Sequence, residues 1–173
     1  MPLPQAPDRL PDDVAAALGH AVASFGFLEE ALKRAIFSLT RKGLGTDASD
    51  LALQAWLQRV EDIADDSLGT LIDSFLATAR RAETPDLAPL AQELPRLRRL
   101  RNLLCHASWR PGEMPGGWHP TFVNTRGESY PGELTAQDVL QIRDRTLAAA
   151  RRIVRIMRAT GIEGRWAGHN GAE

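Results

Sequence analysis

The sequence predicts an all-α protein, an up-and-down bundle of about five helices with a small β-hairpin before the last helix. Apolar residues recur at spacings of three and four over several long stretches, which is the periodicity of amphipathic helices. Capping residues precede these stretches, and glycine or proline follows them. A chain of 173 residues suits one domain. We therefore expect a single helical domain over residues 1–173, with an ordered core of about 12–161 and frayed ends.

The first helix is expected from Asp12 to Thr40. Its apolar seam consists of Leu18, Ala21, Phe25, Leu28, Leu32, Ala35 and Leu39. Beside the seam runs a ridge of small side chains, Ala16, Gly19, Ala23 and Gly26. A glycine inside a helix costs roughly 1 kcal/mol relative to alanine. The ridge therefore predicts a close helix contact, either within the fold or across a dimer.

The second and third helices follow a glycine-containing break at residues 42–45. Thr46 or Asp47 is expected to cap a short second helix. The acidic run at residues 61–66 then leads to Ser67 and a third helix that ends near Arg81. Carboxylates stabilise a helix N-terminus, so the run predicts a solvated cap, and a metal site is the weaker alternative.

The fourth helix is expected between Thr84 and His106, where Pro89 and Pro95 can open or kink it. Its buried stripe consists of Leu90, Leu94, Leu97, Leu100, Leu104 and Ala107. Prolines and glycines then crowd residues 111–132, which predicts a long loop. Within it, residues 121–123 and 129–130 flank a turn-forming tetrapeptide at 124–127 and predict the small hairpin.

The last helix is expected to open at Thr135, which can form a capping box with Asp138, and to stop at Gly161. Its seam consists of Val139, Ile142, Thr146, Ala149, Ile153, Ile156 and Thr160.

The net charge of −1 conceals two opposed halves of the chain. Residues 1–95 hold 8 Lys+Arg against 15 Asp+Glu, whereas residues 96–173 hold 13 against 7. This asymmetry predicts self-complementary packing or a surface for an anionic partner such as nucleic acid. The sequence has no secretion signal and no apolar stretch long enough to cross a membrane, and it has one cysteine, Cys105. We expect a cytoplasmic protein without membrane contact.

Residues 96–106 hold the highest concentration of side chains that could bind or transform a substrate. Four arginines and a histidine occur there within three helical turns, and no acidic residue lies among them. Asn102 and His106 are four residues apart and share a helix face, and Arg101 can fold its long side chain towards Asn102. Histidine can move a proton near neutral pH, and guanidinium can neutralise charge that builds on phosphorus. These groups suit metal-free cleavage of RNA, and two copies across a dimer would supply both an acid and a base.

The pattern Arg101-Asn102-x-x-x-His106 near a helix end, inside an all-helical domain of this size, resembles the HEPN (higher eukaryotes and prokaryotes nucleotide-binding) superfamily. The resemblance implies an R-x4-6-H motif in which Arg101 and His106 from two protomers form one composite site. It implies a homodimeric, metal-independent endoribonuclease that leaves 2′,3′-cyclic phosphate and 5′-hydroxyl ends. Active members of that family are often toxins with a cognate antitoxin protein, or phage-defence effectors. Other members are catalytically inactive and serve as nucleotide-binding or scaffold modules.

One departure from the family pattern concerns the residue two positions after the histidine. Toxins inhibited by a nucleotidyltransferase antitoxin often carry tyrosine there, whereas this chain has Ser108, and Tyr130 is its one tyrosine. Silencing by modification of a tyrosine beside His106 is therefore not expected.

The remaining assignments have open alternatives. Arg98 and Arg99 are candidates for substrate phosphate or belong to a solvated face. Glu29 either orders Arg101 or pairs with Lys33. His106 could also be a helix-end imidazole without chemistry. We expect no cofactor and no metal, since phosphate-binding glycine motifs and metal-ligand spacings are lacking. The alternative functions are a non-catalytic module that binds RNA, a nucleotide or a protein, and a purely structural domain.

Overall fold

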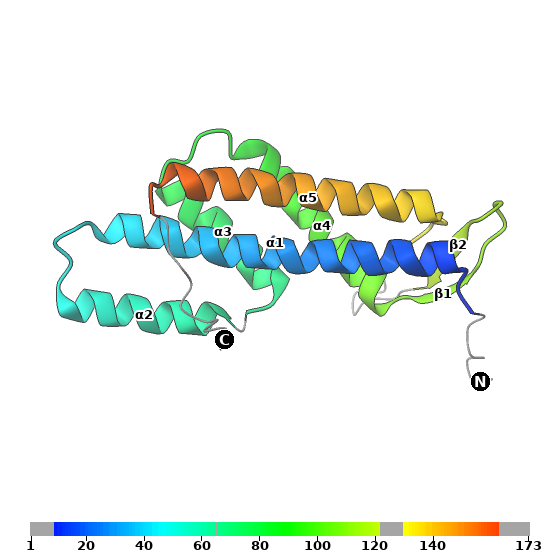
Figure 1. The fold of residues 1–173 in the computed structure, drawn as a ribbon, viewed down its shortest axis with the longest axis horizontal. Helices are drawn as coiled ribbons and strands as arrows, with labels where there is room; N and C mark the ends of the chain where they lie inside the picture. Colours follow the sequence, from blue (N-terminus) through cyan, green and yellow to red (C-terminus); the bar gives the residue numbers. More distant parts are fainter. Residues whose placement is uncertain (1–8, 65, 122–129, 163–173) are drawn as a thin grey trace, which may run out of the picture. The chain divides into compact units, whose positions relative to one another are not determined.

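The computed structural model describes residues 9–64, 66–121 and 130–162. Within them the chain forms five α-helices and one two-stranded sheet (Figure 1). In chain order these are α1 (Asp12–Leu44), α2 (Asp50–Ala64), α3 (Leu68–Arg81), α4 (Ala88–His106), β1 (Ser108–Pro111), β2 (Trp118–Thr121) and α5 (Ala136–Ala159). The predicted all-α bundle with a hairpin before its last helix is confirmed. The ends predicted to fray lie outside the described residues, apart from residues 9–11 and 162.

The chain folds as two compact units, each assembled from segments that are distant in sequence. Unit 1 comprises residues 1–26 and 96–147, and unit 2 comprises residues 27–95 and 148–173. Each of α1, α4 and α5 contributes one part to each unit. The sequence motif at residues 96–106 therefore belongs to unit 1.

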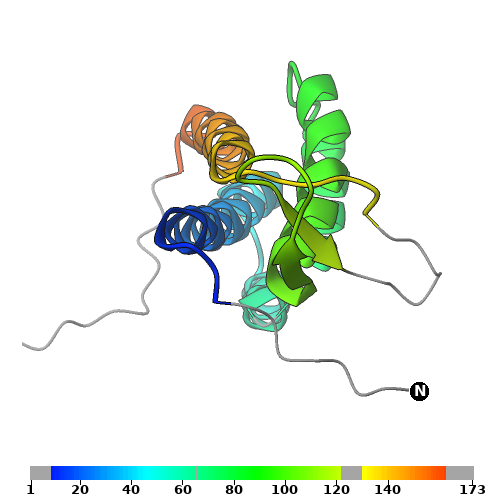
Figure 2. The same ribbon diagram turned by 90° about the vertical axis from the view of Figure 1, so that its right-hand side faces the viewer.

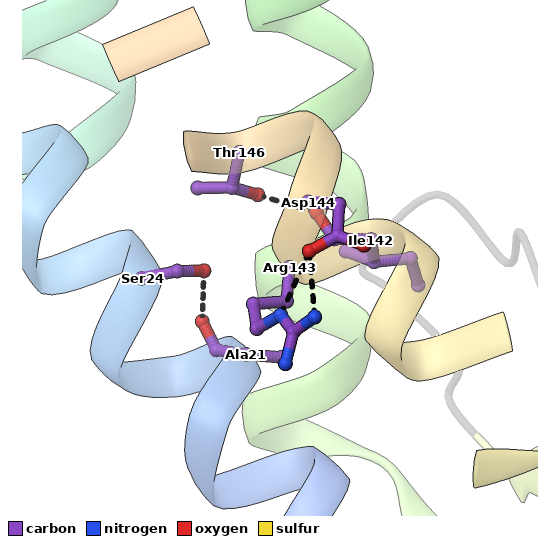
Figure 3. Close-up of polar contacts among 6 residues, drawn as sticks. All are labelled: Ala21, Ser24, Ile142, Arg143, Asp144 and Thr146. Carbon is purple, nitrogen blue, oxygen red and sulfur yellow. Dashed lines mark hydrogen bonds and ion pairs between the residues drawn. The ribbon is translucent and has the colours of Figure 1, made fainter. Parts of the chain in front are cut away.

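Unit 1 combines the first half of α1, the second half of α4, the hairpin and the first half of α5. Its buried apolar side chains are Val14, Ala17, Ala21, Phe25, Leu97, Leu103, Leu104, Trp109, Trp118, Leu134, Val139 and Ile142. Two buried hydroxyl groups are satisfied within their own helices (Figure 3). Ser24 Oγ donates to the Ala21 carbonyl at 2.6 Å, and Thr146 Oγ1 donates to the Ile142 carbonyl at 2.8 Å. These polar side chains can therefore lie in the core with their hydrogen bonds satisfied.

The hairpin of unit 1 pairs β1 and β2 in antiparallel register, with Trp109 opposite Pro120 and Pro111 opposite Trp118. Figure 2 shows it beside the end of α4. It lies upstream of the predicted position. The predicted strands and turn, apart from Thr121 and Tyr130, lie outside the described residues, and Thr121 belongs to β2. The sequence predicted a hairpin before the last helix but misplaced its strands, because prolines occupy both observed strands. A two-stranded ribbon tolerates them, since it has no central strand.

Glu133 stabilises the connection between β1 and β2 through hydrogen bonds. Its carboxylate accepts backbone N–H bonds from Glu113 at 2.7 Å and from Met114 at 2.9 Å. These two bonds hold the pKa of Glu133 below its ordinary value. A Cβ atom at Gly112 or Gly117 would overlap this carboxylate, so both glycines leave it room.

The N-terminus of α5 is a capping box, as predicted. Asp138 Oδ2 accepts bonds from the Thr135 backbone N–H at 2.8 Å and from the Thr135 hydroxyl at 2.6 Å. In return, the backbone N–H of Asp138 donates to Thr135 Oγ1 at 3.2 Å. Most of the predicted seam is buried, namely Val139, Ile142, Thr146, Ala149 and Ile153, whereas Ile156 and Thr160 are half-buried.

Unit 2 combines the second half of α1, helices α2 and α3, the start of α4 and the end of α5. In this unit α2 packs on α1 through Trp56, whose indole N–H donates to Thr40 Oγ1 at 3.0 Å. The rings of Trp56 and Phe37 lie 4.7 Å apart between centroids. Helix α3 opens at Ser67 as predicted, with Ser67 Oγ accepting from the Thr70 N–H.

Three predicted boundaries are wrong. Helix α1 continues through Gly43 to Leu44, and the chain turns at Gly45, which adopts a φ of 71°. Ser49, not Thr46 or Asp47, caps α2, because its Oγ accepts from the Ala52 N–H at 3.3 Å. Helix α2 runs on to Ala64, so Glu61 and Asp62 of the acidic run are helical residues of α2, whereas Asp66 directly precedes Ser67, the N-cap of α3.

The small ridge of α1 makes no close contact within the described fold. Ala16, Gly19, Ala23 and Gly26 are exposed, and a Cβ atom added at either glycine would meet nothing within 4 Å. The predicted helix contact within the fold is therefore wrong for the described residues. The contact across a dimer stays a prediction.

Candidate functional site

The candidate site lies on the last three turns of α4. The helix is continuous from Ala88 to His106 and includes Pro95. Three leucines of this segment are buried and mark the side of the helix that faces the core, Leu97, Leu103 and Leu104. The polar residues of the motif are therefore described by their positions around the helix relative to this buried side.

Four of the predicted site residues share one face of α4. Because successive residues are about 100° apart on an α-helix, Arg98, Asn102 and His106 follow one another at about 40° steps. Arg99 lies within about 20° of His106. Arg98, Arg99 and His106 are exposed, and Asn102 is half-buried. We refer to Arg98, Arg99, Asn102 and His106 as the α4 basic face.

The α4 basic face is electrostatically suited to an anion. In the described part of the chain, no ion pair engages Arg98 or Arg99. Their guanidinium groups therefore remain available for charge-assisted hydrogen bonds to phosphate oxygens. The face also contains no acidic residue between Arg96 and His106 that would repel such a ligand.

Arg101 lies on a different side of the helix. It is five residues before His106, which places the two Cα–Cβ bonds about 140° apart around the axis. Arg101 is half-buried at the edge of the leucine stripe and interacts with a neighbouring group. The helix thus brings Asn102 and His106 together and directs Arg101 away from them.

The chain turns immediately after His106. The Ala107 N–H donates to the Leu103 carbonyl at 2.9 Å, and β1 begins at Ser108, which is exposed. Trp109 is 7% exposed, so it packs in the core and is not available to stack a base. Tyr130 is half-buried and starts the next described segment.

The other chemically reactive side chains contribute less. Glu29 belongs to unit 2 and is half-buried, and its predicted link to Arg101 stays a prediction. Cys105 is a free, exposed thiol beside the motif. His119 is engaged through Nδ1, which lies 3.1 Å from the Gly132 carbonyl. Among the described residues, no group of three or more His, Cys, Asp or Glu side chains could hold a metal ion.

Comparison of the chain with protein-family models, curated proteins and solved structures finds no match. The helices of residues 9–64, 66–121 and 130–162 include none with the length and apolarity needed to cross a membrane. Function is therefore inferred from the residues of α4 themselves.

Proposed function

We propose that this protein is a metal-independent endoribonuclease of the HEPN type that acts in the cytoplasm as a homodimer. The observation that supports the proposal most is the α4 basic face, where an exposed imidazole, an amide and two guanidinium groups occur together without an acid. A toxin or phage-defence role with a cognate antitoxin protein is the biological setting that the motif resemblance implies.

The proposed reaction is a transesterification at phosphorus. His106 takes the proton from a ribose 2′-hydroxyl, and the 2′-oxygen attacks the adjacent phosphorus. The bond from phosphorus to the 5′-oxygen breaks, and the leaving oxygen takes its proton from water. The products are a 2′,3′-cyclic phosphate and a 5′-hydroxyl. Asn102 orients the imidazole, Arg98 and Arg99 bind neighbouring phosphates, and Arg101 stabilises the charge that develops on the phosphoryl oxygens.

The dimer is part of the proposal because of the helix geometry. Arg101 and His106 diverge by about 140° on one α4, which disfavours their meeting at one phosphate within one copy. Two copies related by a two-fold axis can pair Arg101 of one with His106 of the other, and the axis then creates two equivalent sites.

The test is cleavage of end-labelled RNA in the presence of EDTA. We expect the parent chain to cut RNA to cyclic-phosphate ends and His106→Ala to be slower by about 100-fold or more. His20→Ala removes another exposed histidine of unit 1 and should leave the rate unchanged. Equal rates for the parent and His106→Ala would refute the assignment.

A non-catalytic module that binds RNA, a nucleotide or a protein is the second candidate. It is favoured by the half-burial of Arg101 and its engagement with a neighbouring group, which are also features of a structural arginine. This candidate predicts RNA binding that weakens with salt and involves no turnover. An inert parent that binds RNA through Arg98 and Arg99 would establish it in place of the nuclease.

A further inference from the structure

A second concave site lies entirely within unit 2, where the last turn of α1, the α3–α4 connection and the last turns of α5 meet. Its volume is about 600 Å³. Pockets that hold small molecules usually measure about 300–1,000 Å³. None of the α4 motif residues lines it, so it is separate from the proposed ribonuclease site.

The pocket has an apolar floor and a cationic rim. Leu39 and Leu90 are almost fully buried, at 6% and 2% exposure, and Ile156 is half-buried beside them. Three cationic residues line the same space, Lys42 from α1 and Arg152 and Arg155 from α5. No ion pair occupies any of these three within the described residues.

Asp86 is the one acidic residue of the lining, which leaves two positive charges in excess. A phosphate monoester carries close to two negative charges at neutral pH and offers several acceptor oxygens. Guanidinium groups bind such oxygens with short, charge-assisted hydrogen bonds. The excess charge therefore matches one phosphate monoester, and the apolar floor matches a compact hydrophobic substituent on it.

The connection that forms one wall is conformationally unusual. Glu83 and Asp86 have φ values of 49° and 53°, and they are the only non-glycine residues of the described chain with positive φ. Between them lie Thr84 and Pro85, both of which line the pocket. Glu83 follows the C-cap Ala82 of α3, where a left-handed residue is the common way for a helix to end, whereas Asp86 lines the pocket itself.

We propose that this pocket binds a small phosphate monoester with an apolar or aromatic substituent. Arg152 and Arg155 hold the phosphate from α5 together with Lys42, and the substituent lies on Leu39, Leu90 and Ile156. This site does not depend on the ribonuclease activity of α4.

The test uses phenyl phosphate, inorganic phosphate and phenol, each titrated into the full chain by calorimetry at about 0.15 M ionic strength. We expect phenyl phosphate to bind more tightly than either fragment, because it alone engages both the rim and the floor. Inorganic phosphate that binds as tightly as phenyl phosphate would overturn the role of the apolar floor. An absence of phenyl phosphate binding would overturn the proposal.

Two double variants on α5 distinguish binding in the pocket from non-specific electrostatic attraction. Arg152→Gln/Arg155→Gln changes the lining, whereas Arg151→Gln/Arg158→Gln removes the same charge from exposed positions outside it. The first should weaken phenyl phosphate binding by about tenfold or more and the second by less than about twofold. Equal losses in two variants whose circular dichroism matches the parent would show non-specific attraction and refute the site.

Discussion

The proposed roles of the α4 basic face follow from where its residues lie on one helix. These residues are Arg98, Arg99, Asn102 and His106. In the proposed reaction the exposed imidazole at the end of α4 transfers a substrate proton, whereas the exposed guanidinium groups bind the phosphates around it. Substitutions should therefore divide into those that stop chemistry and those that weaken binding. The sequence analysis placed Asn102 and His106 on one face through their four-residue spacing, and the same spacing brings Arg98 to that face.

Removal of both phosphate-binding arginines should change the salt dependence of RNA binding. On single-stranded RNA, we expect Arg98→Gln/Arg99→Gln to reduce the slope of log K against log salt concentration by about 0.7 for each phosphate that is no longer neutralised. The measurement is a salt titration on 2′-O-methyl RNA, which lacks the nucleophile and stays intact. Arg151→Gln/Arg158→Gln is the control with the same charge change, and an equal drop in both slopes would contradict specific phosphate binding.

At the scale of elements, periodicity predicted the helices, and local side-chain chemistry decided their ends. The seams of α1, α4 and α5 follow the spacing of apolar residues, and most of them are buried. The start of α2 was missed because three residues before it, Thr46, Asp47 and Ser49, can all cap a helix, and in the structure Ser49 accepts the capping hydrogen bond. The hairpin was predicted, but its strands were misplaced because strand pairing is non-local and the prolines of the observed strands indicated a loop.

The capping box of α5 gives a prediction about pH. Bonds from the Thr135 hydroxyl and backbone hold the pKa of Asp138 below its ordinary value of 3.8. A carboxylate with a lowered pKa in the folded state stabilises the fold above its unfolded pKa, and this contribution is lost as the pH falls through the lowered folded value. Thr135→Ala should cost about 1 kcal/mol at pH 7.

Urea unfolding from pH 7 to pH 3 measures both effects. The difference in unfolding free energy between the parent and Thr135→Ala should shrink as the pH falls below about 4, because Asp138 then protonates first in the unfolded state. Thr121→Ala, at an exposed threonine in β2, controls for removal of a hydroxyl elsewhere. A gap that stays constant down to pH 3 would show that the Asp138 charge does not contribute.

The exposed ridge of α1 supplies a second prediction for an element. A Cβ atom at Gly19 or Gly26 meets open space, so alanine should gain helix propensity without a clash. We expect Gly19→Ala and Gly26→Ala each to raise the unfolding free energy by about 1 kcal/mol, measured by urea unfolding. If the ridge packs against a second copy, the same variants should also self-associate more weakly in sedimentation experiments. A loss of stability in the dilute chain would contradict the open geometry.

For the whole molecule, sequence and topology contribute differently to the two candidate sites. The α4 basic face was predictable because its residues lie within nine positions of one helix. The pocket of unit 2 was not predictable, because Lys42, Asp86 and Arg155 come from three separate segments that only folding brings together. The divergence of Arg101 from His106 follows from their five-residue spacing on a helix that the sequence also predicts, and α4 is helical through His106.

A mixture of two inactive variants tests whether the site is composite. If Arg101 of one copy acts with His106 of the other, a heterodimer of Arg101→Ala and His106→Ala keeps one intact site of two. Random subunit exchange yields half heterodimers, so the mixture should recover about a quarter of the parent's cleavage rate in EDTA, although each variant alone is inactive. A parent that leaves RNA intact, or a fully exchanged mixture that stays inactive, would refute the composite ribonuclease site.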